Sequence, residues 1–393
     1  MDKATLDRLT NLEMGSVSLI FLSLVIFIYL VIYSKRLVSS KIEKKSCVFL
    51  VISILCFCVF AFFDGDWFHY RDIYYEILNN SNLYDIVYKD ITSFFMSNAY
   101  THMETIYIAY ILAAPANYFL FRIVVWGVSL LCTYVMVKNL GCNKVWFYYL
   151  FICVFLWTFS YSRTSLSYSL AFMGLSFLLK DKKRIISIFV GVAIILFSTL
   201  FHKSAIFLIF IIPFSFIEMT PHRILFLLFT IILIGGSFTV LSKGILLGLD
   251  GFLVAESFQA YMDNAYSAST DGSIIRIIIT QYLKYLPYFA FFIIFCKMII
   301  SRDYFTWPKS IKVFANSAVL IIAASVLFLF MGGYMLFYRL IFFAIIPILV
   351  VLTHLADSKR DAKSINTIKN IGLFISFFTI LYSLYFSVVK GIY

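Results

Sequence analysis

The stretch IISIFVGVAIILFSTLF, residues 185–201, contains no charged side chain. Apolar runs of similar length recur along the chain from residue 17 to residue 389. A helix of about 17–25 apolar residues crosses the hydrocarbon core of a bilayer, which is roughly 30 Å thick. The whole chain of 393 residues is 62% hydrophobic and 13% charged, whereas soluble domains average about 45–50% apolar and about 25% charged residues. The sequence therefore predicts an all-α, polytopic membrane protein.

We predict about 12 membrane-spanning helices from the positions of these runs. The predicted spans are residues 16–33, 47–63, 118–137, 145–161, 164–179, 185–201, 204–218, 223–247, 277–299, 313–331, 335–354 and 370–389. Residues 1–14 lack the basic start and the cleavage site of a signal peptide, so the first span is predicted to be retained. Residues 1–393 are then a single integral-membrane domain.

Basic residues concentrate in every second loop between the predicted spans. Residues 34–46 contain five Lys or Arg and one Glu, and basic loops follow at residues 138–144, 180–184, 297–312 and 357–369. Loops rich in Lys and Arg face the cytoplasm. The formal net charge of +12 therefore reflects topology, and we expect no nucleic-acid partner.

The alternate loops are acidic and two of them are long. Residues 64–104 and 249–273 are predicted to be periplasmic loops, and an even number of spans places both termini in the periplasm as well. Residues 105–114 are apolar but too short to cross the membrane, and Pro115 follows them. We therefore predict that this segment is a re-entrant or interfacial amphipathic helix in the outer leaflet.

The seven cysteines are scattered along the chain and form no CxxC pair. This pattern argues against a disulfide framework and against a zinc site. No acidic pair with ligand-like spacing lies near the cationic residues discussed next, so we expect neither a metal nor another cofactor.

Several ionisable residues lie at the outer ends of the predicted spans, where they are costly and often mark a site. The isolated cations are Arg163, His202 and Arg339, and Lys203 follows His202 at the turn between two predicted spans. An arginine binds phosphate in bidentate fashion and keeps its charge at low dielectric, and histidine donates to phosphate oxygens. A desolvated carboxylate serves as a general base, and the candidates are Glu104 and Asp66. Together, these cations and a carboxylate suit a lipid-linked pyrophosphate substrate.

Each of these residues also has a structural interpretation. His202 fits a helix cap as well as a binding role. Arg122, Arg276 and Lys284 are expected to extend along the lipid to the headgroups, as long basic side chains at span ends often do. A binding site is favoured because all of these ionisable residues lie at the same predicted depth in the membrane.

Five short motifs occur in a distinctive order. They are DWFHYRDIYY (residues 66–75), Glu104 with Tyr107, Ser162-Arg163-Thr164, FHKSA (residues 201–205) and Tyr338-Arg339. This order resembles the EpsG-like branch of the Wzy-type polysaccharide polymerases, which make O-antigen and exopolysaccharide. The resemblance extends over residues 64–340. This chain has Thr164 after the arginine, where relatives often have glutamine.

The resemblance implies a glycosyltransferase C-like membrane enzyme of the bacterial inner membrane, active in lipopolysaccharide or exopolysaccharide biosynthesis at its periplasmic face. Such an enzyme joins oligosaccharide repeat units carried on undecaprenyl pyrophosphate. By this resemblance Arg163, His202, Arg339 and Lys203 bind the donor pyrophosphate. Glu104 activates the acceptor hydroxyl, with Asp66 as the alternative base. The secondary candidates are Arg276, Lys284 and Tyr338. The implied partners are the flippase that delivers repeat units and the chain-length regulator.

Three other functions are compatible with a polytopic chain of this kind. They are a lipid-linked oligosaccharide flippase, the ligase that transfers finished O-antigen to lipid A core, and a membrane O-acetyltransferase. A transporter needs polar groups at mid-membrane on broken helices. Here Pro213, Pro287 and Pro347 have no charged residue beside them at mid-span, which favours an enzyme.

Overall fold

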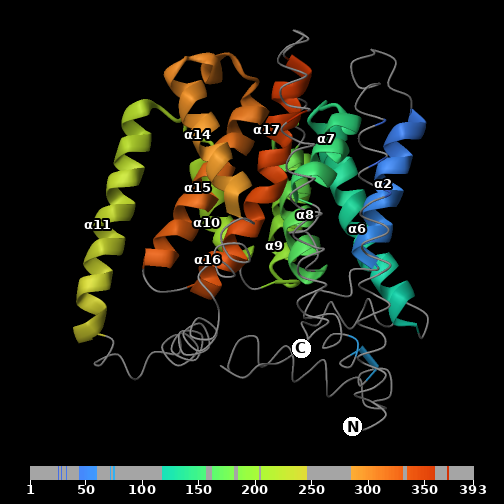
Figure 1. The fold of residues 1–393 in the computed structure, drawn as a ribbon, viewed down its shortest axis with the longest axis horizontal. Coiled ribbons are helices and arrows are strands. Elements are labelled where there is room, and N and C mark those ends of the chain that lie inside the picture. Colours follow the sequence, from blue (N-terminus) through green and yellow to red (C-terminus); the bar gives the residue numbers. More distant parts are fainter. Residues whose placement is uncertain are drawn as a thin grey trace. The chain divides into compact units, whose positions relative to one another are not determined.

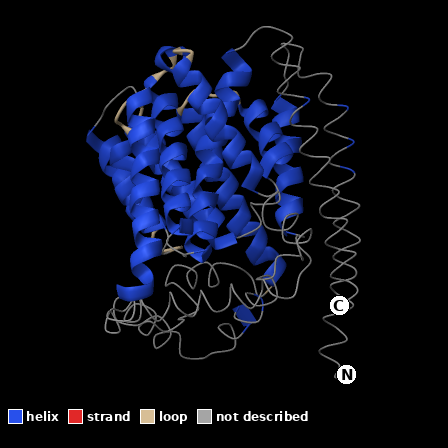
Figure 2. Cartoon of the chain, turned by 60° about the vertical axis from the view of Figure 1, so that its left-hand side comes forward, coloured by secondary structure: helices blue, strands red, loops and turns tan. Residues whose placement is uncertain are grey.

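The computed structural model of the chain consists of helices (Figure 1). It describes residues 25, 28, 32, 44–59, 71, 74, 75, 117–155, 162–180, 185–202, 205–245, 285–330, 334–358 and 370. Over this part of the chain the helices are joined by short turns, and none of the described residues forms a strand (Figure 2). The predicted all-α class is confirmed.

The helices follow the apolar runs of the sequence. They are α2 (Lys44–Val59), α6 (Tyr118–Asn139), α7 (Lys144–Leu150), the π-helical turn η1 (Phe151–Phe155), α8 (Ser162–Leu178), α9 (Ile185–Ser198), α10 (Ile206–Ser215), α11 (Pro221–Ile245), α14 (Leu286–Ile300), the 3₁₀ turn η7 (Asp303–Thr306), α15 (Lys309–Phe330), α16 (Tyr334–Ile341), the 3₁₀ turn η8 (Phe342–Ala344) and α17 (Ile345–Ser358). Every predicted span except the first and the last coincides with one of these helices or helical runs. The first and last predicted spans lie outside the described residues apart from residues 25, 28, 32 and 370. The two long loops predicted to be periplasmic, apart from residues 71, 74 and 75, and the 105–114 segment also lie outside them.

Three of the described helices are long and apolar enough to cross a membrane. They are Tyr118–Asn139, Lys309–Leu329 and Arg339–Ser358. The other apolar helices of the described part have 10–17 residues, such as Ile185–Ser198 and Pro287–Ile300. The chain is therefore a membrane protein, and the number of crossings stays a prediction.

The chain divides into two compact units. The first unit comprises Met1–Val87, Thr105–Ser169 and Leu352–Tyr393, and the second comprises Tyr88–Glu104 and Leu170–Val351. The boundary falls within α8 and within α17. The prediction of a single domain over residues 1–393 stays a prediction.

In the first unit, α2 packs against α6 and α7. Helix α6 begins where the Asn117 side chain accepts hydrogen bonds from the backbone N–H groups of Phe119 and Leu120 at 2.9 and 3.5 Å. It ends at Asn139, and Gly141, directly after the C-cap residue Leu140, has a φ of 67°, the left-handed conformation that commonly terminates a helix. Asn143 caps α7 in the same way as Asn117 caps α6, at 3.1 and 3.3 Å from the N–H groups of Val145 and Trp146. Side-chain caps thus define the short α6–α7 turn.

In the second unit, α15 packs against α10, α11, α14 and α16. Its buried residues include Ala315, Ser317 and Ala318, and such small side chains let membrane helices approach one another closely. Helices α8 and α9 also approach each other closely through small residues. A Cβ built on Gly174 would lie 2.7 Å from the carbonyl oxygen of Gly191.

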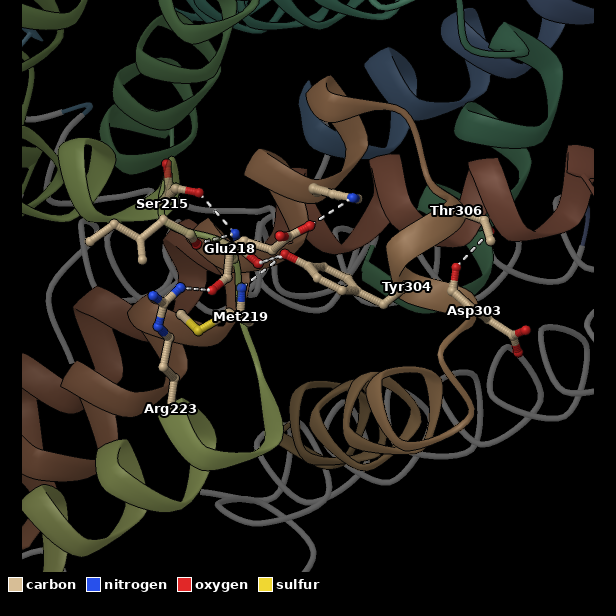
Figure 3. Close-up of polar contacts among 10 residues, drawn as sticks. Ser215, Glu218, Met219, Arg223, Asp303, Tyr304 and Thr306 are labelled. Carbon is tan, nitrogen blue, oxygen red and sulfur yellow. Dashed lines mark hydrogen bonds and ion pairs between the residues drawn. The ribbon is translucent and has the colours of Figure 1, made fainter.

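The α10–α11 and α14–α15 turns of the second unit are joined by a buried polar cluster (Figure 3). Asn316 Nδ2 donates to the carbonyl oxygens of Ser215 and Ile217 at 2.9 and 2.8 Å. The Tyr304 hydroxyl donates to Asn316 Oδ1 at 2.9 Å and accepts from the Met219 N–H at 3.2 Å. Burial raises the pKa of Tyr304, so the phenol keeps its proton at neutral pH and acts as this donor. Both turns therefore lie at one end of the second unit, as the alternation of loops requires.

Candidate functional site

His202 lies four residues before Ile206, the first residue of α10, and is buried, with 7% of its surface exposed. Its backbone carbonyl accepts a hydrogen bond from the N–H of Ala205, the N-cap residue of α10, at 2.9 Å. The imidazole centroid lies 6.2 Å from the ring centroid of Phe343 in η8. The side chain therefore points into the protein and contacts the helical run α16–η8–α17.

Arg339 lies in the last turn of α16 and is partly buried. It precedes Phe343 by four residues, which is about one helical turn. Because the His202 ring lies against Phe343, the structure brings an imidazole and a guanidinium to the same region of the second unit. Tyr338, the neighbour of Arg339, belongs to the same helix.

Aromatic side chains close the same region. The ring of Tyr285, the N-cap residue of α14, lies 4.9 Å from the ring of Phe337 in α16. Tyr285 and Tyr288 are both buried. Helices α10 and α14 end beside the two turns that the polar cluster joins, whereas His202 and Tyr285 precede the first residues of these helices. The region of His202 and Tyr285 therefore lies at the other end of α10 and α14 from the polar cluster.

Arg163 is the second residue of α8 and belongs to the first unit. Among the remaining candidates, Asp66, Glu104, Lys203, Arg276 and Lys284 lie outside the described residues. The structure thus describes two candidate side chains, those of His202 and Arg339, and both belong to the second unit.

The helix that begins with Ser162-Arg163 buries several hydroxyl groups that the sequence motifs did not single out. Thr164, Ser165, Ser167 and Ser169 are all buried, and the Ser165 hydroxyl lies 2.8 Å from the Tyr168 hydroxyl. The buried hydroxyls of Ser169 and Thr353, both in the first unit, have no hydrogen-bond partner within the described part of the chain. Such groups are expensive to bury. The feature of the sequence that marks these hydroxyl groups is the density of Ser and Thr in residues 162–169.

The expectation that Arg122 extends to the lipid headgroups is wrong. The residue is 1% exposed, its Nη2 donates to the carbonyl oxygen of Cys58 at 2.6 Å, and its guanidinium carbon lies 6.0 Å from the centre of the Tyr118 ring. Cys58 lies in the last turn of α2, where backbone carbonyls lack partners within the helix. The guanidinium satisfies one of them, so Arg122 ties α2 to α6.

A buried imidazole and a nearby guanidinium in apolar, aromatic surroundings stabilise negative charge more strongly than they would in water, because the local dielectric is low. Within the described residues, no three His, Cys, Asp or Glu side chains lie together as metal ligands would.

A protein-family model described as the EpsG family matches residues 48–392. This range contains all of the candidate residues named above. Comparison with curated proteins and comparison with solved structures each give no significant match. The resemblance inferred from the order of the motifs is confirmed at the level of the family.

Proposed function

Because the chain belongs to the EpsG family, we propose that it is a membrane glycosyltransferase that polymerises oligosaccharide repeat units. Its substrates are repeat units linked to undecaprenyl pyrophosphate, and it works at the periplasmic face of the bacterial inner membrane. The observation that carries the proposal is the buried His202 imidazole, which packs against Phe343 one turn from Arg339. Two cationic side chains at one end of a membrane unit suit a substrate whose leaving group is a diphosphate.

The proposed reaction transfers the growing glycan from its lipid carrier to a new unit. The bond between the donor sugar's anomeric carbon and the pyrophosphate oxygen breaks, and a bond from that carbon to an acceptor hydroxyl oxygen forms. The acceptor proton passes to Glu104, or to Asp66 as the alternative base. Undecaprenyl pyrophosphate leaves with the bonding electron pair, and Arg163, His202, Lys203 and Arg339 neutralise its charge.

The wider arrangement belongs to the same proposal. The enzyme has a glycosyltransferase C-like fold with about 12 spans and with both termini in the periplasm. The secondary contacts to substrate come from Arg276, Lys284 and Tyr338. The flippase that supplies repeat units and the chain-length regulator are its partners in the membrane.

Single substitutions in the native host test the proposal. His202→Ala and Arg339→Ala should each reduce long-chain surface polysaccharide roughly 100-fold, the scale on which loss of one preorganised charge-stabilising group acts. One-repeat product should persist at normal protein level, because delivery and ligation of repeat units are intact. The readout is the ladder of surface polysaccharide on a gel, with Arg163→Ala in parallel.

His222→Ala is the matched control, because His222 is exposed at the turn end of the second unit. Its ladder should equal that of the native protein. Loss of all capped product in the His202 and Arg339 variants would indicate a flippase or a ligase instead. Unchanged ladders in the Arg163, His202 and Arg339 variants would exclude the assigned site.

A further inference from the structure

An open pocket lies at the turn end of the second unit, where α11 begins and α14 ends. It is lined by Pro221, Ile299, Ile300, Arg302 and Phe305. Four of the five lining residues are apolar, and Arg302 is the one charged group among them. A pocket of this composition suits an amphipathic ligand with an anionic head.

Arg302 has an unusual backbone conformation. Its φ is 64°, and among the described residues other than glycine it is the one with a positive φ. It follows Ser301, the C-cap residue of α14. Glycine or asparagine adopts this conformation at lower energy than arginine. The arginine is therefore not explained by the needs of the turn.

The Arg302 guanidinium is also available to a ligand. The residue is exposed and forms no ion pair within the described part of the chain. The carboxylate of its neighbour Asp303 accepts a hydrogen bond from the Ser301 hydroxyl at 2.8 Å. The other acid at this end, Glu218, lies 2.8 Å from Lys312 Nζ.

The surroundings of the pocket combine positive charge with exposed apolar side chains. Residues 218–223 and 297–312 contain five Lys or Arg and two acids. Ile300 is 75% exposed, Ile293 on the same helix is 68% exposed, and Phe226 on α11 is 70% exposed. Side chains of this kind face acyl chains in a membrane, while the basic residues lie at the headgroup level.

We propose that this pocket binds an anionic phospholipid. The Arg302 guanidinium donates to the phosphodiester oxygens in bidentate fashion, and an acyl chain lies along Ile300 and Ile293 on α14. The site lies at the opposite end of the second unit from His202 and Arg339 and does not depend on the proposed polymerase activity. By the charge of the loops, the lipid comes from the cytoplasmic leaflet.

The thermal stability of the purified full-length protein in mixed micelles tests this proposal. The probe is phosphatidylglycerol, with zwitterionic phosphatidylcholine as the comparison. Saturating phosphatidylglycerol should raise the Tm of the native protein by roughly 3–6 °C more than phosphatidylcholine does. The variant Arg302→Asn removes the guanidinium but suits the left-handed backbone, so it should fold and should lose at least half of this increase.

Lys309→Gln is the matched control, because Lys309 is an exposed cation at the same end that does not line the pocket. It should keep the full increase. Glycerol phosphate, which offers a phosphate anion without acyl chains, should produce no increase. The proposal is overturned if Arg302→Asn responds like the native protein, if Lys309→Gln loses as much as Arg302→Asn, or if glycerol phosphate alone reproduces the effect.

A second measurement needs no variant. Native mass spectrometry of the unmodified protein, released from micelles with equal amounts of the two lipids, should show phosphatidylglycerol retained at least threefold over phosphatidylcholine. Equal retention of the two lipids would contradict the proposal.

Discussion

Asn316→Leu should lower the free energy of unfolding by roughly 2–6 kcal/mol, because it leaves three hydrogen-bonding groups without their partner, and the two that are fully buried cost about 1–3 kcal/mol each. These groups are the carbonyls of Ser215 and Ile217 and the hydroxyl of Tyr304, at 2.9, 2.8 and 2.9 Å from the amide. Asn316 is 1% exposed, so water does not replace the lost contacts. Since the amide joins the α10–α11 turn to the α14–α15 turn, its loss should also loosen both.

The measurement is thermal unfolding of the purified full-length protein in detergent. Ser317→Ala is the matched control, because Ser317 is equally buried but donates within its own helix to Val313 O at 2.9 Å. It should change stability by less than about 1 kcal/mol. Equal melting temperatures of the Asn316→Leu and Ser317→Ala variants would show that the polar cluster does not hold the turns together.

Gly174→Val should destabilise the α8–α9 pair by roughly 3 kcal/mol or slightly more, at the upper end of the cost of overpacking a tight interface. A Cβ on Gly174 would lie 2.7 Å from the Gly191 carbonyl oxygen and 2.9 Å from a side-chain carbon of Ile195. The backbone oxygen cannot move away without shifting the helix. The two helices would therefore have to separate, and Gly191→Val should have a similar effect, because its Cβ would lie 2.8 Å from Gly174 O.

Gly127 supplies the control for these glycine variants. A Cβ at Gly127 in α6 would meet nothing within 4 Å. Gly127→Ala should therefore be neutral or stabilising by about 0.5–1 kcal/mol, since alanine favours the helix, whereas Gly174→Ala should destabilise. Thermal unfolding in one detergent gives both values. The same sign of change for the two alanine variants would contradict the close approach of α8 and α9.

The positions of the helices follow from the sequence because a long uncharged run has one stable form in a bilayer, a helix with its backbone hydrogen bonds satisfied internally. The predicted span 118–137 corresponds to α6 (Tyr118–Asn139), and 335–354 corresponds to the run from Tyr334 to Ser358. The ends depend on local chemistry that hydropathy does not contain. Helix α10 ends at Ser215, inside the predicted span 204–218, where the polar cluster binds the carbonyls of the turn.

Contacts between helices were less predictable. From the sequence, Arg122 is expected to face the lipid because it lies near the end of a predicted span. In the structure its partner is the backbone carbonyl of Cys58, 64 positions earlier in the chain. The Gly174–Gly191 contact and the buried hydroxyls of α8 likewise depend on which helix faces which. Single-sequence hydropathy has no information about this pairing.

For the candidate site, sequence position indicated that His202 and Arg339 lie at span ends. It did not indicate that Phe343 and Tyr285 would line the region. The ring of His202 contacts Phe343, which follows Arg339 by four residues, and this contact depends on packing rather than on charge spacing. A sequence pattern of isolated cations identifies candidates, and tertiary packing decides which of them meet.

Reconstitution of the purified protein with a synthetic undecaprenyl-pyrophosphate-linked repeat unit tests the central claim most directly. The native protein should convert this single substrate into a ladder of longer lipid-linked glycans and should release one undecaprenyl pyrophosphate for each bond formed. His202→Ala and Arg339→Ala should fold and release little of it, and His222→Ala should match the native protein. If the folded native protein, given its native repeat unit, forms neither polymer nor free undecaprenyl pyrophosphate, it is not a polymerase of this kind.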